Sequence, residues 1–299
     1  MPAQLIDGKA VSAQIRAELT TQAAKLREAG IVPRIAVVLV GEDPASQSYV
    51  KAKAKASDEI GIRVDIHRLD GSGEPAAIEA ATLVLIQQLN ADPMVDGIIV
   101  QLPLPEGVAA DALLRAIDPR KDVDGLHPEN QGHLLQGAPC YLPATPHGVQ
   151  QLLVRTGNDP GGKHVVIVGR SKLVGMPLAA MLLQKRAGAN ATVTVCHTGT
   201  PDLGVHTRQA DILVAAVGRP GVVTADMVRP GAVVIDVGVN RVDEASRERG
   251  YRLVGDVDFG AVREKASFIT PVPGGVGPMT GAMLLTNVVR AARERRSQR

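Results

Sequence analysis

Apolar residues follow two rhythms along this chain. Short, nearly continuous apolar runs alternate with longer stretches in which apolar residues recur every third or fourth position. The runs are typical of buried parallel strands, and the stretches are typical of helices that cover a sheet. The alternation predicts an α/β protein with parallel sheets.

The first part of the chain is expected to form one α/β domain. Its strands are predicted at Arg34–Val40, Arg63–Leu69 and Gly97–Gln101, and its helices at Lys9–Ala29, Ala45–Ile60 and Pro75–Asn90. Thr145 followed by Pro146 is typical of an N-cap and a first helical turn, which predicts a further helix to about Arg155. This helix is expected to link the first domain to a second one.

The alternation starts again after residue 162. Strands are predicted at His164–Val168, Thr192–Cys196, Asp211–Ala215 and Ala232–Val237. The glycine- and proline-rich segment Thr270–Thr280 predicts a loop before a last helix that ends near Arg293. Because a long apolar helix needs a partner, we expect this helix to pack on the first domain.

The chain length supports two domains. Its 299 residues exceed the usual size of one hydrophobic core. We assign residues 1–145, completed by a helix at 279–299, to the first domain. Residues 146–278 are assigned to the second.

Charge and apolar content exclude several classes of protein. The net charge of +2 gives no electrostatic reason to expect a nucleic-acid partner, and the basic run Arg290–Arg299 is expected to be solvated on the last helix. No apolar run approaches the roughly 20 residues of a membrane span, and no secretion signal opens the chain, so we expect a cytoplasmic protein without a membrane partner. Neither the two cysteines nor the seven histidines have metal-ligand spacing, so no metal is expected.

The most informative segment is Val165–Pro177. It predicts a strand, a tight turn at Gly169 and the amino terminus of a helix, with Arg170 and Ser171 in the turn. Backbone N–H groups and the helix dipole make such a corner a phosphate site. We therefore expect a dinucleotide cofactor, although the G-x-G-x-x-G pattern is absent.

The following strand favours NADP over NAD. Sites for NAD usually place Asp or Glu at the end of this strand, where this chain has His197 and Thr198. A carboxylate that would repel the 2′-phosphate is missing, and Arg170 is suited to bind that phosphate. The same residues are also compatible with a glycine turn whose Arg170 is merely solvated.

Polar residues suited to catalysis follow the strands of the first domain. Tyr49 and Lys53 are four residues apart, on one face of a predicted helix. A partly desolvated lysine can transfer protons. Because Lys51 and Lys55 lie on the same helix, the spacing alone favours a row of solvated lysines.

Two further segments carry amide and carboxylate side chains. Gln101 closes an apolar strand, so its amide needs a partner in the protein or in a substrate. Asp122 and Asp124 are suited to accept hydrogen bonds from the amidine-like edge of a heterocycle. A purely structural amide and an acidic turn are the alternatives.

Several ordered blocks together resemble one family. They are Ser48–Lys53, Asp96–Pro105, Lys121–Gly125, Gly169–Ser171 with Val174, Gly175 and Pro177, and Pro271–Thr280. Over almost the whole chain they are similar to the bifunctional methylenetetrahydrofolate dehydrogenase/methenyltetrahydrofolate cyclohydrolases of one-carbon metabolism.

The resemblance implies a fold and two reactions. An amino-terminal α/β catalytic domain would be followed by a Rossmann-like domain that binds NADP. The enzyme would oxidise 5,10-methylenetetrahydrofolate to the 5,10-methenyl compound with NADP and then hydrolyse it to 10-formyltetrahydrofolate, within tetrahydrofolate interconversion. A homodimer is implied as well.

The resemblance also implies roles for individual residues. Lys53 would transfer protons in the cyclohydrolase step, Gln101 would hold its amine, Tyr49 would position the folate and Asp124 would bind the pterin ring. Pro273 and Gly277 would contact the substrate, in a loop expected to close over a site between the domains. The cofactor would be bound by Gly169, Arg170, Ser171, the Thr198 hydroxyl and the backbone of Val239.

Two other functions compete with this one. A monofunctional dehydrogenase would lack the water addition, and the presence of Lys53 with Gln101 argues against it. A nucleotide-sensing protein would keep the fold without catalysis. A sensor has no need for the set Tyr49, Lys53, Gln101 and Asp124.

Overall fold

The computed structural model describes residues 1–247 and 250–297. The side chains of Ala45, Tyr49, Ala52, Arg296 and Ser297 lie outside this description. The chain forms two compact units. Residues 14–143 and 281–299 make up what we call the three-stranded unit, and residues 1–13 and 144–280 make up the six-stranded unit.

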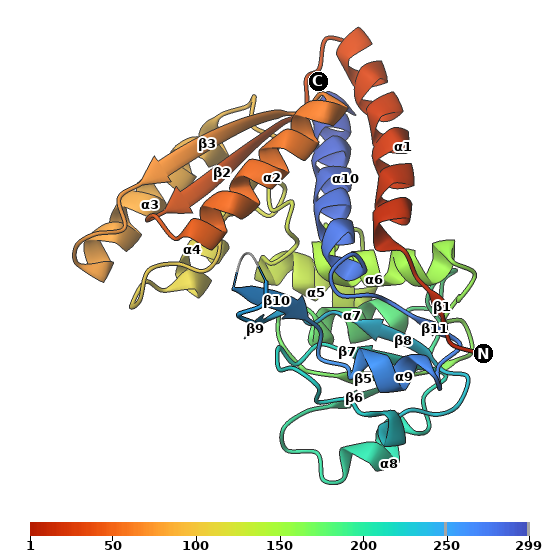
Figure 1. The fold of residues 1–299 in the computed structure, drawn as a ribbon. Coiled ribbons are helices and arrows are strands. Elements are labelled where there is room, and N and C mark those ends of the chain that lie inside the picture. The colour runs from red at the N-terminus through yellow and green to blue at the C-terminus, as the bar shows by residue number, and fades with distance from the viewer. Residues whose placement is uncertain (248–249, 298–299) are drawn as a thin grey trace. The chain divides into compact units, whose positions relative to one another are not determined.

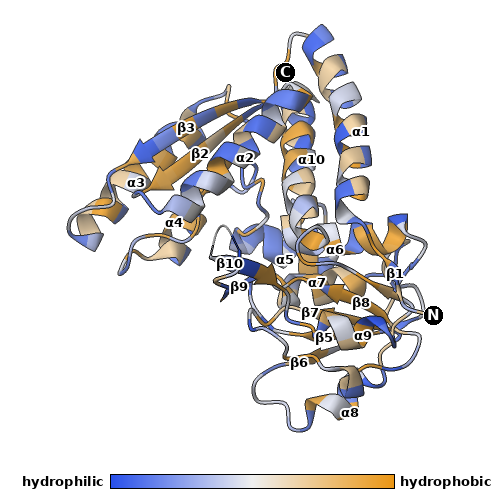
Figure 2. Cartoon of the chain, in the orientation of Figure 1, coloured by the Kyte–Doolittle hydropathy of each residue, from blue (hydrophilic) through white to orange (hydrophobic). Residues whose placement is uncertain are grey.

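The three-stranded unit is built on a parallel sheet with the strand order β3-β2-β4. Its elements are β2 (Arg34–Val40), α2 (Pro44–Ile60), β3 (Arg63–Leu69), α3 (Pro75–Ala91), β4 (Gly97–Val100), α4 (Ala110–Ala116) and α5 (Pro128–Gln136), as labelled in Figure 1. The side chains of the central strand β2 and its neighbour β4 are almost all buried. In β3, exposed side chains are interspersed with half-buried ones. Figure 2 shows the same contrast between an apolar β2 and a partly hydrophilic β3.

Helices pack on both faces of β2. Ala36, Val38 and Val40 share a core with residues of α3 and α4. Val37 and Leu39 pack against Val50 of α2. Because successive side chains of a strand point to opposite faces, the continuous apolar run of β2 serves two helical layers.

The six-stranded unit has the strand order β1-β11-β8-β7-β5-β6, and every neighbouring pair is parallel. Its strands are β1 (Gln4–Leu5), β5 (His164–Val168), β6 (Thr192–Cys196), β7 (Ile212–Ala215), β8 (Val233–Asp236) and β11 (Phe268–Ile269). A separate antiparallel pair joins β9 (Asn240–Asp243) to β10 (Tyr251–Val254). The remaining elements are α6 (Ala144–Arg155), α7 (Gly175–Leu182), α8 (Leu203–Thr207), the 3-10 helix Ala225–Met227 and α9 (Phe259–Arg263).

Two long helices, α1 (Gly8–Glu28) and α10 (Val276–Ser297), pass from one unit to the other. The part of α10 after residue 280 belongs to the three-stranded unit. There Asn287 donates its side-chain amide to the carbonyl oxygens of Val123 (2.8 Å) and Leu142 (2.9 Å). The predicted α/β class and the return of the last helix to the first domain are confirmed. Among the described residues, no helix is both long and apolar enough to cross a bilayer.

Three local predictions were wrong. Helix α6 begins at Ala144, so Thr145 lies in its first turn and its hydroxyl is 2.9 Å from that of Thr280. Helix α10 begins at Val276, within the predicted loop, because a first turn tolerates Gly277 and proline, whose missing N–H needs no partner there. Arg290 and Arg295 of the basic run are only partly solvated, because their guanidinium groups are bound within the three-stranded unit, whereas Arg293 is exposed. Arg296 and Arg299 lie outside the described side chains.

Candidate active site

A lysine and a glutamine meet at the carboxyl end of β4. Lys53 comes from α2, and its Nζ donates to the side-chain oxygen of Gln101 at 3.0 Å. The amide nitrogen of Gln101 donates to the carbonyl oxygen of Leu102 at 2.6 Å, which fixes the orientation of the amide. The predicted partner of Gln101 is therefore the amine of Lys53.

Burial distinguishes Lys53 from the other lysines of its helix. Lys51 and Lys55 are exposed, whereas Lys53 is half-buried. Burial lowers the pKa of the Lys53 amine, and the negative charge of Asp124 offsets part of that effect. The interpretation of these residues as one solvated row therefore fails for Lys53. The side chain of Tyr49 lies outside the described residues.

The two predicted aspartates serve different ends. Asp122 is buried and accepts hydrogen bonds from the backbone N–H of His127 (2.7 Å) and the side-chain amide of Asn130 (2.9 Å). Its carboxylate is thus occupied in holding the start of α5. Asp124 lies near Lys53, and burial raises the pKa of its carboxyl while the charge of Lys53 acts in the opposite direction. Only Asp124 stays available as a ligand for a heterocycle.

A glycine brings the Asp124 segment close to β4. Ile98 pairs with Asp122 as a parallel bridge. A Cβ atom on Gly97 would lie 2.5 Å from the Val123 side chain, so a larger residue would push this segment away from the strand. The local sequence therefore sets how close Asp124 and Gln101 lie.

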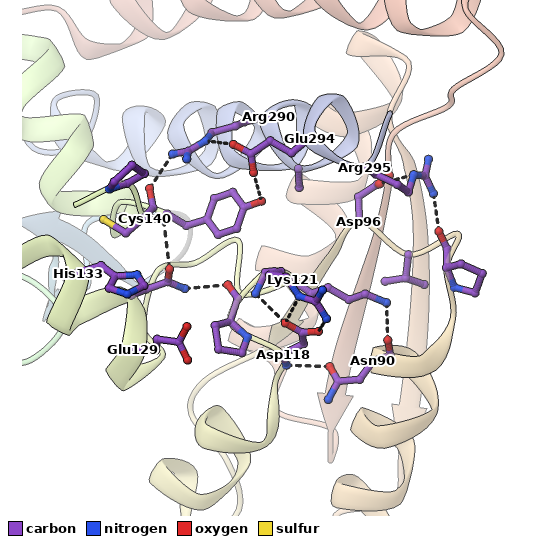
Figure 3. Close-up of a pocket in the computed structure, with 18 of the residues that line it drawn as sticks. Asn90, Asp96, Asp118, Lys121, Glu129, His133, Cys140, Arg290, Glu294 and Arg295 are labelled. Atoms are coloured by element: carbon purple, nitrogen blue, oxygen red, sulfur yellow. Dashed lines mark hydrogen bonds and ion pairs between the residues drawn. The ribbon is translucent and has the colours of Figure 1, made fainter. Parts of the chain in front are cut away.

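A cavity of about 660 Å³ lies at the other end of β4. Figure 3 shows Arg290, Glu294 and Arg295 of α10 lining it together with Asp96 and Lys121. Its charges are bound to one another: Arg295 pairs with Asp96 at 3.0 Å, and Arg290 pairs with Glu294 at 2.7 Å. Lys121 donates to three backbone carbonyl oxygens at the end of α3. This cavity fits a role in docking α10.

In the six-stranded unit, the turn after β5 is built by two glycines. Gly169 has a φ of +126°, and a Cβ atom on it would lie 2.2 Å from the carbonyl oxygen of Ala216. A Cβ atom on Gly175 would lie 2.0 Å from the carbonyl oxygen of Gly169. Arg170 and Ser171 are exposed in this turn, at the start of α7. A tight turn, a helix amino terminus and an exposed arginine fit a phosphorylated dinucleotide.

The other predicted cofactor and substrate residues lie in the same unit. Thr198 is exposed in a tight turn after β6, where the N–H of Thr200 donates to the carbonyl oxygen of His197 at 2.8 Å. Val239, after β8, is 50% exposed between two more buried neighbours. Pro273 precedes α10 and Gly277 lies in its first turn, and both are exposed.

The sequence pattern missed two buried carboxylates, Asp236 and Asp256. Asp236 closes the apolar strand β8 as Gln101 follows β4. The same signal, a polar residue at the end of an apolar run, would have singled out Asp236. Asp256 has no comparable signal, because the strand before it is short and partly exposed.

Comparison with known proteins identifies the family. Residues 6–124 match a family model described as the tetrahydrofolate dehydrogenase/cyclohydrolase catalytic domain, and residues 143–296 match its NAD(P)-binding domain. The chain belongs to the tetrahydrofolate dehydrogenase/cyclohydrolase family. The predicted family is confirmed, and with it the prediction of an enzyme with both a dehydrogenase and a cyclohydrolase activity.

Other members of the tetrahydrofolate dehydrogenase/cyclohydrolase family match almost the entire chain. The bifunctional protein FolD of Syntrophus aciditrophicus is 54% identical over 293 residues, 98% of each chain. The bifunctional FolD structure from Campylobacter jejuni has a TM-score of 0.91 at 48% identity and covers 98% of this chain and 99% of its own. The FolD structure from Trypanosoma brucei, a complex with NADP and an inhibitor, has a TM-score of 0.91 at 39% identity. The match covers 100% of this chain and 99% of the Trypanosoma brucei chain.

Proposed function

We infer that this chain catalyses two consecutive steps of folate one-carbon metabolism. It oxidises 5,10-methylenetetrahydrofolate to 5,10-methenyltetrahydrofolate with NADP and hydrolyses the product to 10-formyltetrahydrofolate. The family assignment supports both reactions. The observation that carries the second reaction is the hydrogen bond between Lys53 and Gln101, since a sensor or a monofunctional dehydrogenase has no need of it.

Lys53 is the proton-transfer residue of the hydrolytic step. Water adds to the electrophilic carbon of the methenyl cation, and a neutral amine takes up the proton that the water releases. The second proton ends on the ring nitrogen when its bond to that carbon breaks, so the overall step releases one proton. The lowered pKa of Lys53 increases the neutral fraction that can act in this way.

Gln101 and Asp124 orient the reacting groups. The Gln101 oxygen accepts from the Lys53 amine without adding a negative charge that would favour the ammonium form. Asp124 binds the donor groups of the pterin ring. Burial raises the pKa of its carboxyl, and the charge of Lys53 beside it acts in the opposite direction. A role for Tyr49 in positioning the folate rests on the resemblance.

The six-stranded unit binds NADP. Gly169 and Ser171 present the turn to the phosphates, Arg170 and Thr198 bind the 2′-phosphate end, and the Val239 backbone meets the nicotinamide end. When bound, NADP accepts the hydride that leaves the methylene bridge. Pro273 and Gly277 contact the substrate. The folate binds to the three-stranded unit, within the proposed domain of residues 1–145 and 279–299, and NADP to that of residues 146–278.

One assay tests both activities. Purified protein is given methylenetetrahydrofolate with NADP or with NAD, and reduced nicotinamide and methenyltetrahydrofolate are followed as separate signals. We expect NADP reduction without accumulation of the methenyl compound, and faster hydrolysis of added methenyl compound than in buffer. Stoichiometric accumulation would indicate a dehydrogenase alone, and no reduction with either cofactor would indicate a binding protein.

The resemblance also supports a homodimer, and the sequence supports a cytoplasmic protein without a nucleic-acid partner. Light scattering of the purified chain tests the first point, with an expected mass of twice that of one chain.

A further inference from the structure

Asp256 organises the segment that follows β7. It is completely buried. One oxygen accepts hydrogen bonds from the backbone N–H of Val217 (2.6 Å) and Gly218 (3.0 Å). The other accepts from the N–H of Arg219 and the side-chain amide of Asn240, both at 2.9 Å. A single carboxylate therefore fixes three consecutive peptide groups and the start of β9.

Asp236 holds Asp256 in turn. One oxygen of Asp236 accepts from the backbone N–H of Gly238 (3.0 Å) and Asp256 (2.9 Å), and the other accepts from that of Val257 (3.0 Å). Its own N–H donates to the hydroxyl of Thr270, just after β11, at 2.7 Å. The two carboxylates thus act in series, and we call Asp236 and Asp256 the carboxylate clamp.

Two glycines leave room for the clamp. A Cβ atom on Gly238 would lie 2.1 Å from a carboxylate oxygen of Asp256. A Cβ atom on Gly255 would lie 1.8 Å from a carboxylate oxygen of Asp236. The carboxylates of Asp256 and Asp236 therefore occupy the space that a side chain at residue 238 or 255 would fill.

Two buried carboxylates are an unfavourable way to fill a protein core. Its named donors are neutral amides, and burying a carboxylate without a cation is unfavourable compared with apolar packing. Burial raises the pKa of Asp236 to about 6. What the carboxylates provide is a fixed direction for the N–H groups that they bind, which apolar side chains do not.

The peptides so fixed lie at the cofactor edge of the sheet. Strands β7, β8 and β11 are parallel to β5, so their carboxyl ends share the edge at which dinucleotides bind. The carbonyl oxygen of Ala216, next to the clamped segment, packs directly on Gly169. The clamped segment Gly238–Asn240 contains the half-exposed Val239.

We propose that Asp236 and Asp256 are positioning residues for NADP, because they hold peptides 217–219 and 238–240 in the conformation that receives the nicotinamide end of the cofactor. This inference rests on the proposed placement of NADP at the carboxyl ends of β5, β7 and β8. Both carboxylates are buried, so they act through these peptides.

The test compares Asp256→Asn and Asp236→Asn with the parent protein. We expect the Kd for NADP, measured by calorimetry, to rise at least tenfold. Amide hydrogen exchange at residues 217–219 is expected to accelerate in Asp256→Asn. Hydrolysis of methenyltetrahydrofolate without NADP is expected to stay within twofold, since Lys53, Gln101 and Asp124 belong to the other unit. Asp243→Asn is the matched control, because Asp243 of β9 is an exposed aspartate of the same unit and lies outside the clamp.

An unchanged Kd for NADP in a folded clamp variant overturns the inference. A parallel loss of hydrolysis and NADP binding also overturns it, because that result indicates a general role in stability. If Asp256→Asn does not fold, Asn240→Ala decides instead: it removes one donor to Asp256 and is expected to raise the Kd about threefold, and no change overturns the inference.

A further variant separates this inference from the proposed function. Arg170→Ala is expected to weaken NADP binding if the phosphates lie at the turn after β5. If Arg170→Ala has this effect and the clamp variants do not, the clamp inference alone fails. If the parent protein binds no NADP, the proposed function fails as well.

Discussion

Strand β4 carries a charged cluster at each end, and the two clusters differ in how their charges are compensated. At the amino end, Asp96 pairs with Arg295 at 3.0 Å. At the carboxyl end, the ammonium group of Lys53 donates to the neutral amide of Gln101 at 3.0 Å. The charge of Arg295 is compensated by a carboxylate, whereas burial lowers the pKa of the Lys53 amine, so that this amine can exchange its proton.

The size of the cavity would select the wrong end. The cavity of about 660 Å³ lies at the amino end, lined by side chains that bind one another. Its hydrogen bonds extend to the ring hydroxyl of Tyr141, which donates to Glu294 at 3.0 Å. Cavity volume alone therefore does not identify the reactive end. A lowered lysine pKa does not identify it either, because burial also lowers the pKa of Lys121, whose amine is held by three backbone carbonyl oxygens at the amino end.

The largest effect is expected from a substitution of Lys53, at the carboxyl end of β4. Lys53→Gln removes the proton-transfer group, so we expect hydrolysis of methenyltetrahydrofolate to fall by about 10² to 10⁴-fold. The Kd for NADP is expected to stay the same, because the cofactor residues belong to the other unit. Lys55→Gln, an exposed lysine of the same helix, is the control and is expected to keep full activity. Equal hydrolysis in both variants at every pH contradicts the role of Lys53.

The second largest effect is expected from a substitution of Arg295, whose partner Asp96 lies at the amino end of β4. Arg295→Met leaves the Asp96 carboxylate buried without its partner, which is expected to lower the free energy of unfolding by about 3 kcal/mol in urea titrations at neutral pH. Hydrolytic activity of the folded variant is expected to stay unchanged. Arg120→Met is the control: its ion pair with Asp118 is solvated, with Arg120 77% exposed, so its loss is expected to lower that free energy by less than about 1 kcal/mol.

The loss of stability in Arg295→Met is expected to depend on pH. Asp96 has a pKa raised to about 6, chiefly by burial, while Arg295 lowers it. Because the folded pKa exceeds the unfolded one, the carboxyl reduces stability as the pH rises between these two values. Losing Arg295 raises the folded pKa further and extends that window upward. The difference between Arg295→Met and parent is therefore expected to be larger at pH 8 than at pH 6, and the reverse order contradicts this assignment.

The smallest effect is expected from a substitution of Asp124, which lies near Lys53. Asp124→Asn removes the negative charge that raises the pKa of Lys53, so burial lowers that pKa further. The acidic limb of the pH profile of kcat for hydrolysis is expected to move to lower pH, and KM for the folate is expected to rise. A limb that moves to higher pH rules out electrostatic coupling between the two groups. Asp122→Asn is not a suitable control, because Asp122 holds backbone N–H groups.

The strands of the three-stranded unit were readily predicted. The predicted bounds of β2 and β3 coincide with those of the structure, and β4 ends one residue earlier. For β2 and β4, a run of apolar, mostly β-branched residues between polar turns leaves few alternatives. The two-residue strand β1 has both residues exposed, and it joins the sheet through backbone pairing with β11, so no apolar pattern marks it.

The roles of charged residues depended on contacts between distant segments. Lys51, Lys53 and Lys55 are equivalent locally. Burial and the contact with Gln101, 48 positions away, set Lys53 apart. Arg295 belongs to a basic run that appears solvated, yet its partner Asp96 lies in a distant part of the chain. Composition and spacing do not contain such pairings, whereas the resemblance did indicate Lys53 and Gln101.

The two helices that pass between the units also constrain the order of folding. Each unit combines segments that are synthesised far apart in time: the three-stranded unit needs residues 281 onward, and the six-stranded unit needs residues 1–13. Neither unit is complete while the ribosome is still translating the middle of the chain, so assembly in the usual order, first unit before second, is not open to this protein. The six-stranded unit has all of its residues once Thr280 has been synthesised, before the three-stranded unit does.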